Sequence, residues 1–332
     1  MKFMIAGLGS IGRRHFRNLQ HLGEKEILLF RSHQATLPDA ELAGFPVETD
    51  LTRALAWKPD VVIISNPTAL HLDVAIPAAR AGCHLFLEKP ISHTMQQVDE
   101  LRLAVERGGG HVLVGFQFRF HPGLRKVASL LAENVIGQPL SFRVQWGEYL
   151  PNWHPWENYK QGYAARGDLG GGVILTLSHP LDYLRWLFGD VQSLWAFASQ
   201  SGALGIPVED VAEIGLRFQS GLIGSVHLDY NRRPPGHSLE IVGAQGTLLW
   251  DNADGGVRWA VAGADGKAGD WQHFAPQPDF ERNTLFLDQT RHLISVARGE
   301  VEPVCSLEDG IQALRLALAA AESSEKGQRM YV

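Results

Sequence analysis

The sequence predicts two domains of different class: an α/β domain on a doubly wound parallel sheet, and an α+β domain with an open, mainly antiparallel sheet. Three observations support this prediction. A glycine-rich turn follows a short apolar run near residue 1, strands and helices alternate through the first third of the chain, and after about residue 118 several strands follow one another. We therefore expect one domain over residues 1–118 and another over residues 119–332.

The first turn has the order strand, glycines, helix. The apolar run 3–6 leads into Gly7-Leu8-Gly9-Ser10-Ile11-Gly12, and apolar residues at helical spacing follow. Gly7 permits a tight turn, Gly9 lets the backbone approach a pyrophosphate, and Gly12 lets the helix pack on the strand. The first N–H groups of that helix would face the anion. The turn therefore predicts a Rossmann domain that binds a dinucleotide through residues 7–12, although the same letters alone also fit an ordinary glycine-rich turn.

The remaining elements of the first domain alternate regularly. Buried strands that alternate with helices form a parallel sheet with right-handed crossovers. We expect strands at 2–6, 26–30, 61–65, 84–87 and 112–116, and helices that include 72–81 and 95–107.

The second domain has a different pattern. In 222–230, apolar residues alternate with polar ones, which indicates an antiparallel sheet with one face covered. We expect strands at 140–146, 211–218, 222–230, 239–242, 247–250 and 257–260, and helices at 122–134, 173–187, 280–297 and 307–323.

The composition excludes several classes of protein. A formal net charge of -6 argues against a broad basic surface for nucleic acid. No apolar run is as long as a membrane span, and the first residues have no signal-peptide pattern. Cys83 and Cys305 lie far apart, which predicts neither a disulfide framework nor a metal cluster. We expect a cytoplasmic protein with no metal, no nucleic-acid partner and no membrane partner.

The end of the second strand bears on the choice of coenzyme. An acid there would accept a hydrogen bond from the ribose 2′-OH of NAD, whereas an arginine accommodates the 2′-phosphate of NADP. The chain has Arg31 and Ser32 at this place and no acid, which favours NADP over NAD. The alternative is that Arg31 is a solvated surface residue.

The next two strands also end in polar residues, where parallel sheets bind ligands. Asn66, Thr68 and His71 are candidates for coenzyme binding, and Thr68 has helix capping as its alternative role. Glu88 and Lys89 end the following strand and are further candidates for coenzyme binding. Lys89 can also hydrogen-bond a substrate hydroxyl beside the coenzyme. The alternative for this pair is a salt bridge at the strand end. Pro90 allows a cis peptide, although trans is the commoner form.

The segment 146–166 is unusually aromatic and contains Tyr149, Trp153 and Tyr163 together with Arg166. Aromatic faces with polar tips suit a sugar ring, and Arg166 or Arg119 can bind a carboxylate or phosphate. These residues are therefore candidates for substrate binding. A cluster that packs a long loop, or a contact between subunits, is the alternative.

Several motifs spread over nearly the whole chain point to one family. Together they resemble the Gfo/Idh/MocA oxidoreductases, which include glucose–fructose oxidoreductase and inositol dehydrogenase. They are Gly7–Gly12, Asn66-Pro67-Thr68 with His71, Ala81-Gly82-Cys83-His84, Glu88-Lys89-Pro90, residues 115–122, Gly170-Gly171-Gly172 with His179 and Asp182, residues 185–189, and residues 306–310.

The resemblance implies hydride transfer between a nicotinamide and a sugar or polyol carbon. It implies that Lys89 is the site lysine and that His179 accepts or donates the proton of the reacting hydroxyl, a task that suits an imidazole with a pKa of about 6.5. It also implies a homodimer or homotetramer formed through the open sheet.

The chain departs from this family at one place. Members commonly carry an acid one helical turn before the histidine, where this chain has Thr176. On a continuous helix Thr176 would share a face with His179 and could hydrogen-bond, but it cannot carry a negative charge. Pro180 predicts a kink or break there, and Asp168 and Asp182 are the nearest carboxylates in the sequence.

We therefore expect an NAD(P)-dependent oxidoreductase that acts on a sugar, sugar acid or polyol. Three other hypotheses stay open. One is an NAD-dependent glycosidase of the same fold, in which the coenzyme is recycled. Another is a non-catalytic sensor of coenzyme or sugar that has lost its acid at Thr176. The third is a structural protein that assembles through its sheet and binds no coenzyme.

Overall fold

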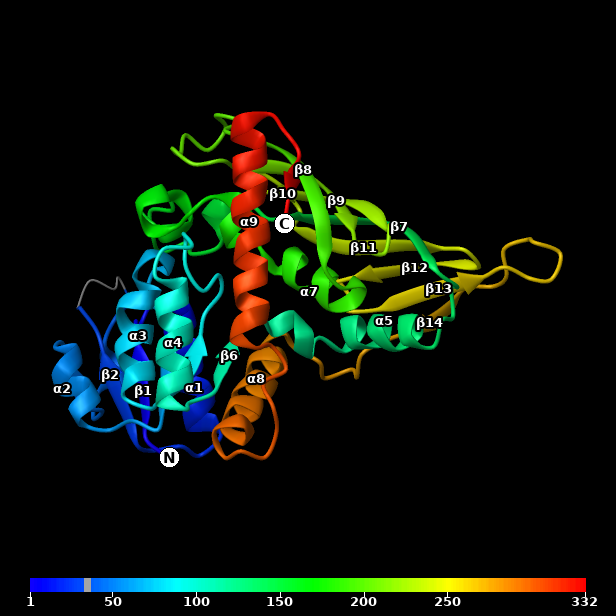
Figure 1. Ribbon diagram of the computed structural model, residues 1–332. Coiled ribbons are helices and arrows are strands. Elements are labelled where there is room, and N and C mark those ends of the chain that lie inside the picture. Colours follow the sequence, from blue (N-terminus) through cyan, green and yellow to red (C-terminus); the bar gives the residue numbers. More distant parts are fainter. Residues whose placement is uncertain (33–36) are drawn as a thin grey trace. The chain divides into compact units, whose positions relative to one another are not determined.

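The computed structural model describes residues 1–32 and 37–332 (Figure 1). These residues form two compact units. The first unit comprises Met1–Gln117, Asp168–Gly170 and Arg282–Leu314, and the second comprises Phe118–Gly167, Gly171–Glu281 and Arg315–Val332. Compared with the expected domains 1–118 and 119–332, the first unit also takes in a turn and a late helical segment.

The first unit holds a six-stranded sheet in which every pair of neighbours is parallel, as predicted. Its strand order is β3-β2-β1-β4-β5-β6, and the central strands β1 and β4 are completely buried. The order reverses between β1 and β4, which is the place where open α/β sheets bind ligands. The strands are β1 (Phe3–Ala6), β2 (Ile27–Phe30), β3 (Val47–Glu48), β4 (Val61–Ile64), β5 (His84–Leu87) and β6 (Val112–Val114).

Helices cover this sheet in pairs. Helices α3 and α4 pack against each other, and so do α1 and α8 (Figure 1). Right-handed crossovers that run in opposite directions from the switch point place α1 and α3 on opposite faces. Helix α9 (Leu307–Lys326) starts in the first unit and continues in the second. The other helices are α1 (Ser10–His21), α2 (Leu51–Ala56), α3 (His71–Arg80), α4 (Val98–Gly108) and α8 (Arg282–Ala297).

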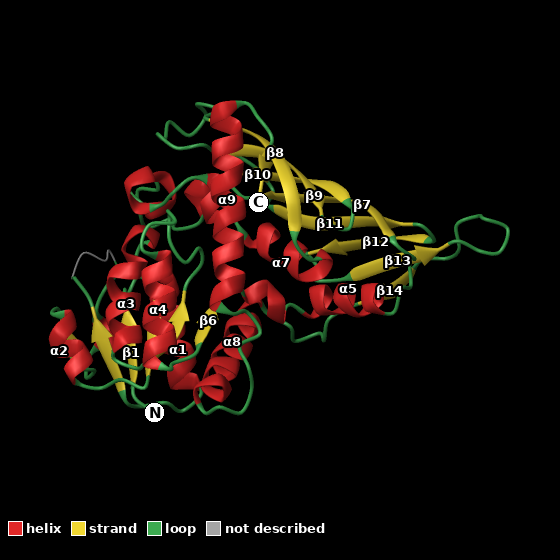
Figure 2. Cartoon of the chain, viewed as in Figure 1, coloured by secondary structure: helices red, strands yellow, loops and turns green. Residues whose placement is uncertain are grey.

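The second unit holds a nine-stranded sheet that is mainly antiparallel, as predicted (Figure 2). One expectation is wrong: β10 is antiparallel to β9 but parallel to β7. The alternation of apolar residues reports which face of a strand is covered and says nothing about the direction of its neighbour. The strands are β7 (Pro139–Gly147), β8 (Val191–Ser199), β9 (Val211–Phe218), β10 (Ile223–Asp229), β11 (Gly236–Gly243), β12 (Gly246–Asp251), β13 (Val257–Val261), β14 (Gln272–Phe274) and β15 (Met330–Tyr331).

The helix expected over 173–187 is instead two helices, α6 (Val173–Thr176) and α7 (His179–Phe188). The predicted break therefore lies just before His179, with Pro180 in the first turn of α7, where a missing N–H costs no helical hydrogen bond. Thr176 and His179 consequently do not share the face of one helix, which corrects the sequence-based expectation. Helix α5 (Pro122–Ala132) packs on β12 and β13.

Within the described part of the chain, no helix combines the length and the apolar character that crossing a bilayer requires.

Candidate coenzyme and catalytic site

The glycine turn of the first unit forms a cradle between β1 and α1. Gly7 has a φ of +89°, and a Cβ there would lie 2.4 Å from the backbone nitrogen of Asn66. A Cβ on Gly12 would lie 2.0 Å from the carbonyl oxygen of Gly7. By contrast, no atom of the described residues lies within 4 Å of a Cβ built on Gly9. The turn is thus closed against the end of β4 and open at Gly9.

The start of α1 is suited to an anion. Helix α1 begins at Ser10, and none of the described side chains caps its first N–H groups. Uncapped N–H groups at a helix start carry partial positive charge and bind phosphate groups. Open space at Gly9 and these donors fit the pyrophosphate of a dinucleotide, and the role of residues 7–12 in binding it stays a prediction.

The end of β4 presents Asn66 beside this cradle. Its Nδ2 donates to the carbonyl oxygen of Leu70 at 2.8 Å, whereas its buried Oδ1 has no hydrogen-bond partner among the described residues. A buried acceptor without a donor is costly, so Oδ1 is suited to accept a hydrogen bond from a ligand. Thr68 is buried but does not cap a helix, because α3 begins at His71 with Leu70 as its N-cap. The capping alternative for Thr68 is therefore wrong.

His71 links two strand ends. Its ring nitrogens lie 3.0 Å from the carbonyl oxygen of Pro90 and 3.0 Å from that of Asn66. Burial lowers the pKa of His71, so the ring is neutral at pH 7 and can donate through only one nitrogen. The ring thus lies between the segments that carry Asn66 and Lys89 and donates a hydrogen bond to one of them, and its contact with a coenzyme stays a prediction.

The end of β5 carries Glu88 and Lys89. Glu88 is buried, and its Oε1 lies 2.8 Å from the Nε2 of His15 on α1. The peptide between Lys89 and Pro90 is cis. Lys89 is half-buried at the carboxyl end of the strand. Sequence reasoning missed His15, because only the folded sheet brings a residue 73 positions away against Glu88.

Arg31 follows β2 and is buried, so the solvated-surface alternative is wrong. Its Nη1 donates to the Oδ1 of Asp39 at 2.7 Å. Ser32 beside it is exposed. Sequence reasoning looked for an acid at the strand end and missed one that lies eight residues later.

The second unit places His179 at the first position of α7. His179 is 3% exposed, and its ring packs edge-on against Phe118 at 5.0 Å and lies 5.5 Å from the ring of Trp146, centroid to centroid. Trp146 in turn stacks on His237 at 4.4 Å. Burial lowers the pKa of His237 well below its ordinary value, so that ring is neutral. An aromatic wall therefore fixes the orientation of His179.

Thr176 lies in a small polar cluster of the same unit. Its side chain is buried and shares a hydrogen bond with the hydroxyl of Tyr230. Near Tyr230 lies Glu209, whose Oε1 accepts the N–H of Ile174 at 3.3 Å. Burial raises the pKa of Glu209. This carboxyl was not among the sequence candidates, because it lies 35 positions from Ile174 and no local pattern marks it.

Arg119 and Asp182 form a buried ion pair. The Nη2 of Arg119 donates to Asp182 Oδ1 at 2.7 Å, and its Nε donates to Oδ2 at 3.0 Å. Their side chains are 5% and 1% exposed. This geometry speaks against Arg119 as a substrate ligand and against Asp182 as the substitute acid, because each ion neutralises the other. Asp168 lies in the first unit and is exposed.

The aromatic segment mainly packs its own unit. Tyr149, Trp153 and Tyr163 lie against the hydrophobic core of the second unit, as the packing alternative expected. Trp153 lies 5.5 Å from the ring of Tyr230, and its buried Nε1 finds no acceptor among the described residues. That N–H is suited to donate a hydrogen bond to a ligand. The side chain of Arg166, the last candidate of this segment, is exposed.

Fold and site together define a dinucleotide-binding protein of the Rossmann class. Residues 1–116 match the oxidoreductase family with an NAD-binding Rossmann fold, and residues 124–249 match the GFO/IDH/MocA C-terminal domain. The chain belongs to the Gfo/Idh/MocA oxidoreductase family, as the motifs predicted.

Known proteins resemble the chain over most of its length. A 1,5-anhydro-D-fructose reductase of Ensifer adhaerens is 29% identical over 82% of this chain and 80% of the relative. A 2,7-anhydro-N-acetylneuraminate hydratase of Mediterraneibacter gnavus is 26% identical over 79% of this chain and 70% of the relative. The solved structure of a levoglucosan dehydrogenase in complex with NADH and L-sorbose superposes with a TM-score of 0.86 at 22% identity, covering 100% of this chain and 98% of that one.

Proposed function

We propose that this protein is a nicotinamide-dependent dehydrogenase or reductase that acts on a CH–OH group of a sugar, sugar acid or polyol. One observation carries the proposal. The open glycine cradle after β1 and the lysine after β5 lie at the carboxyl edge of one parallel sheet, around its switch point. The sugar-derived substrates in the names of the relatives support the substrate class.

The residues would divide the work as follows. When bound, a nicotinamide coenzyme supplies or accepts the hydride. Gly7, Gly9, Ser10, Ile11 and Gly12 would hold its pyrophosphate, and Asn66, Thr68 and His71 would line its nicotinamide half. Lys89 would donate a hydrogen bond to the reacting oxygen, and His179 would exchange the proton of that hydroxyl. For substrate binding we retain Tyr149, Trp153, Tyr163, Arg166 and Thr176 and leave out Arg119.

For the coenzyme we propose NAD(H), although the sequence favoured NADP. Arg31 was the reason to expect a 2′-phosphate, and its guanidinium is bound to Asp39 at 2.7 Å. The levoglucosan dehydrogenase whose fold this chain shares was solved in complex with NADH, which supports the same choice.

A second function is favoured by one relative. The hydratase of Mediterraneibacter gnavus is named for an addition or loss of water, with no net oxidation in its name. In the matching alternative for this chain, the coenzyme is reduced and reoxidised within one turnover, so product forms without a lasting change in absorbance at 340 nm (the reduced-nicotinamide band).

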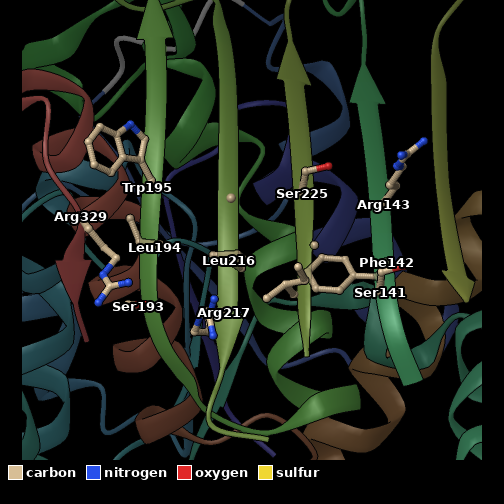
Figure 3. A pocket seen from close by; sticks show the side chains of 13 residues that line it. Ser141, Phe142, Arg143, Ser193, Leu194, Trp195, Leu216, Arg217, Ser225 and Arg329 are labelled. Carbon is tan, nitrogen blue, oxygen red and sulfur yellow. The ribbon is translucent and has the colours of Figure 1, made fainter. Parts of the chain in front are cut away.

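We also propose that the protein is a homodimer or homotetramer formed through the outer face of the nine-stranded sheet. That face exposes Trp195, Phe197 and Ile223. Trp195 and Ile223 also line a shallow pocket, together with Arg143 and Arg217 (Figure 3). Exposed apolar residues among charged ones are typical of a contact between subunits. We place the protein in the cytoplasm, which suits two buried cysteines that form no disulfide among the described residues.

The proposed roles can be tested with two variants and matched controls. Purified protein is titrated with NADH by fluorescence, and then assayed against sugars, sugar acids and polyols at 340 nm and by product analysis. We expect Lys89→Met and His179→Gln to lower kcat by about 10²–10⁴-fold while the Kd for NADH changes little, because both act on substrate rather than on the dinucleotide. Lys25→Met and His273→Gln, both at exposed positions, serve as controls.

Each outcome separates the hypotheses. Near-normal turnover in either variant contradicts the assigned role. Product without a net change at 340 nm supports the recycled-coenzyme alternative. Coenzyme binding without any product across the panel supports the sensor hypothesis.

A further inference from the structure

A cluster of charged residues in the first unit lies beside the expected adenosine end of the coenzyme. Arg31 follows β2, and its Nη1 donates to Asp39 Oδ1 at 2.7 Å. Asp39 is 58% exposed at its side chain, whereas Arg31 is 6% exposed. The guanidinium is therefore covered, while the carboxylate can still accept a hydrogen bond from a ligand. The Nε of Arg31 has no hydrogen-bond partner among the described residues.

Arg13 holds Asp39 at this position. Arg13 lies on α1 and its side chain is 1% exposed. Its Nη2 donates to the carbonyl oxygen of Leu37 at 2.9 Å and to Asp39 Oδ1 at 3.2 Å. Its Nη1 donates to the carbonyl oxygen of Pro38 and, at 2.8 Å, to Glu41 Oε1. One buried guanidinium thus fixes the segment that carries Asp39.

The same arginine connects this segment with the glycine turn. The Nε of Arg13 donates to the carbonyl oxygen of Leu8, between Gly7 and Gly9, at 3.1 Å. The turn is also joined to the end of β2, because the N–H of Gly7 donates to the carbonyl oxygen of Phe30 at 3.1 Å. Hydrogen bonds therefore connect Asp39 and Arg31 with the glycine cradle that fits the pyrophosphate. Both residues follow β2, the strand whose end contacts the adenosine ribose in Rossmann domains.

We propose that Asp39 is the residue that selects NAD(H) over NADP(H) in this protein, with Arg13 and Arg31 holding it in place. The inference rests on the proposed function, since only a nicotinamide coenzyme poses this choice. A carboxylate accepts a hydrogen bond from the ribose 2′-OH of NADH. The same carboxylate repels the 2′-phosphate of NADPH and occupies the guanidinium that would otherwise bind it.

Arg31 and Arg13 stabilise the negative charge on Asp39 that distinguishes NADH from NADPH. An aspartate is ionised at neutral pH, and the hydrogen bond from Arg31, with a further contribution from Arg13, lowers the pKa of Asp39, so the carboxylate also stays ionised at more acidic pH. Arg31 is then a latent phosphate ligand. It becomes available to a 2′-phosphate only when the negative charge on residue 39 is removed.

The test measures binding rather than turnover. Full-length wild type, Asp39→Asn, Arg31→Ala and the double variant are each titrated with NADH and with NADPH, with nicotinamide fluorescence as the signal. Asp73→Asn, at an exposed position on α3, is the matched control. Thermal unfolding by circular dichroism verifies that each variant is folded. The bonds from Arg13 to Glu41 and to the carbonyl oxygens of Leu37 and Pro38 remain in Asp39→Asn.

We expect wild type to bind NADH at least about tenfold more tightly than NADPH. Asp39→Asn should raise the affinity for NADPH by about tenfold or more, and the gain should vanish in the double variant because it requires Arg31. An unchanged NADH-to-NADPH ratio in Asp39→Asn, or a gain that persists without Arg31, overturns the inference. If neither coenzyme binds to wild type, the proposed function itself is wrong and the inference falls with it.

Discussion

At the scale of single residues, the site depends on buried charged groups whose partners lie far away in the sequence. Glu88 meets His15 across 73 positions, and Arg119 meets Asp182 across 63. Removing one member of such a pair leaves an uncompensated charge inside the protein. Local patterns predicted Lys89, Asn66 and His179 as site residues, because strand ends and motifs mark them. They could not predict which carboxylate neutralises Arg119, since tertiary packing decides that.

The Arg119–Asp182 pair gives a prediction about stability. Asp182→Asn should lower the free energy of unfolding by about 3–5 kcal/mol, because it removes the negative charge that the buried Arg119 guanidinium contacts at 2.7 Å. Asp190→Asn removes the partner of Arg185 in a pair whose carboxylate side chain is 58% exposed, and should cost about 1 kcal/mol or less. Urea unfolding followed by circular dichroism measures both. Equal losses in the two variants would contradict the assignment of a buried structural pair.

At the scale of elements, the turn between β1 and α1 follows from glycine sterics, which is why sequence alone predicted it. Gly7 and Gly12 are needed to close the turn, whereas Gly9 keeps a space open. Other elements escaped prediction. Strands β3 and β15 have two residues each, too few for a period to show. Pro180 predicted a kink or break near His179, but it did not show that α6 ends at Thr176 and that α7 begins at His179.

The two kinds of glycine should respond differently to alanine. Gly12→Ala places a Cβ 2.0 Å from the carbonyl oxygen of Gly7 and should lower the free energy of unfolding by about 1–3 kcal/mol. Gly9→Ala meets no atom of the described residues within 4 Å and should leave stability within about 0.5 kcal/mol of wild type.

Coenzyme binding then separates the two roles. Gly9→Ala fills the space proposed for the pyrophosphate, so its Kd for NADH should rise by about tenfold or more, which corresponds to about 1.4 kcal/mol. Unfolding curves and NADH titrations on the same preparations provide both measurements. Normal affinity in a folded Gly9→Ala variant would show that the pyrophosphate does not lie there.

At the scale of the whole molecule, the chain forms two units that are not two continuous segments. The segment Arg282–Leu314 belongs to the first unit although it follows most of the second. A helix over 280–297 was predicted within the second domain, but the sequence did not show that this helix packs on α1 of the first unit. The outer face of the nine-stranded sheet is the face that exposes Trp195 and Phe197 of β8. On it, Trp195 lies opposite Gly215 of β9, and Phe197 lies opposite Glu213.

That face gives a prediction about assembly. Wild type should elute as a dimer or tetramer in size-exclusion chromatography with light scattering. Phe197→Glu, at a side chain that is 68% exposed, should shift it to monomer, because a charge buried in an apolar contact is unfavourable. Leu103→Glu changes an apolar residue that is 48% exposed and lies on α4 of the first unit, and should leave the assembly intact. A monomeric wild type would exclude the sheet contact.

The sequence by itself determined the dinucleotide turn, the parallel sheet and the strand-end positions of Asn66 and Lys89. These features follow from local causes, namely glycine sterics and the spacing of apolar residues. Only the tertiary structure decided that Arg31 is held by Asp39, that Glu88 meets His15, and that Arg119 is neutralised by Asp182. The physical reason is that burying a charge requires a partner, and folding supplies that partner from a residue that no local pattern connects with it, eight positions away for Arg31 and 73 for Glu88.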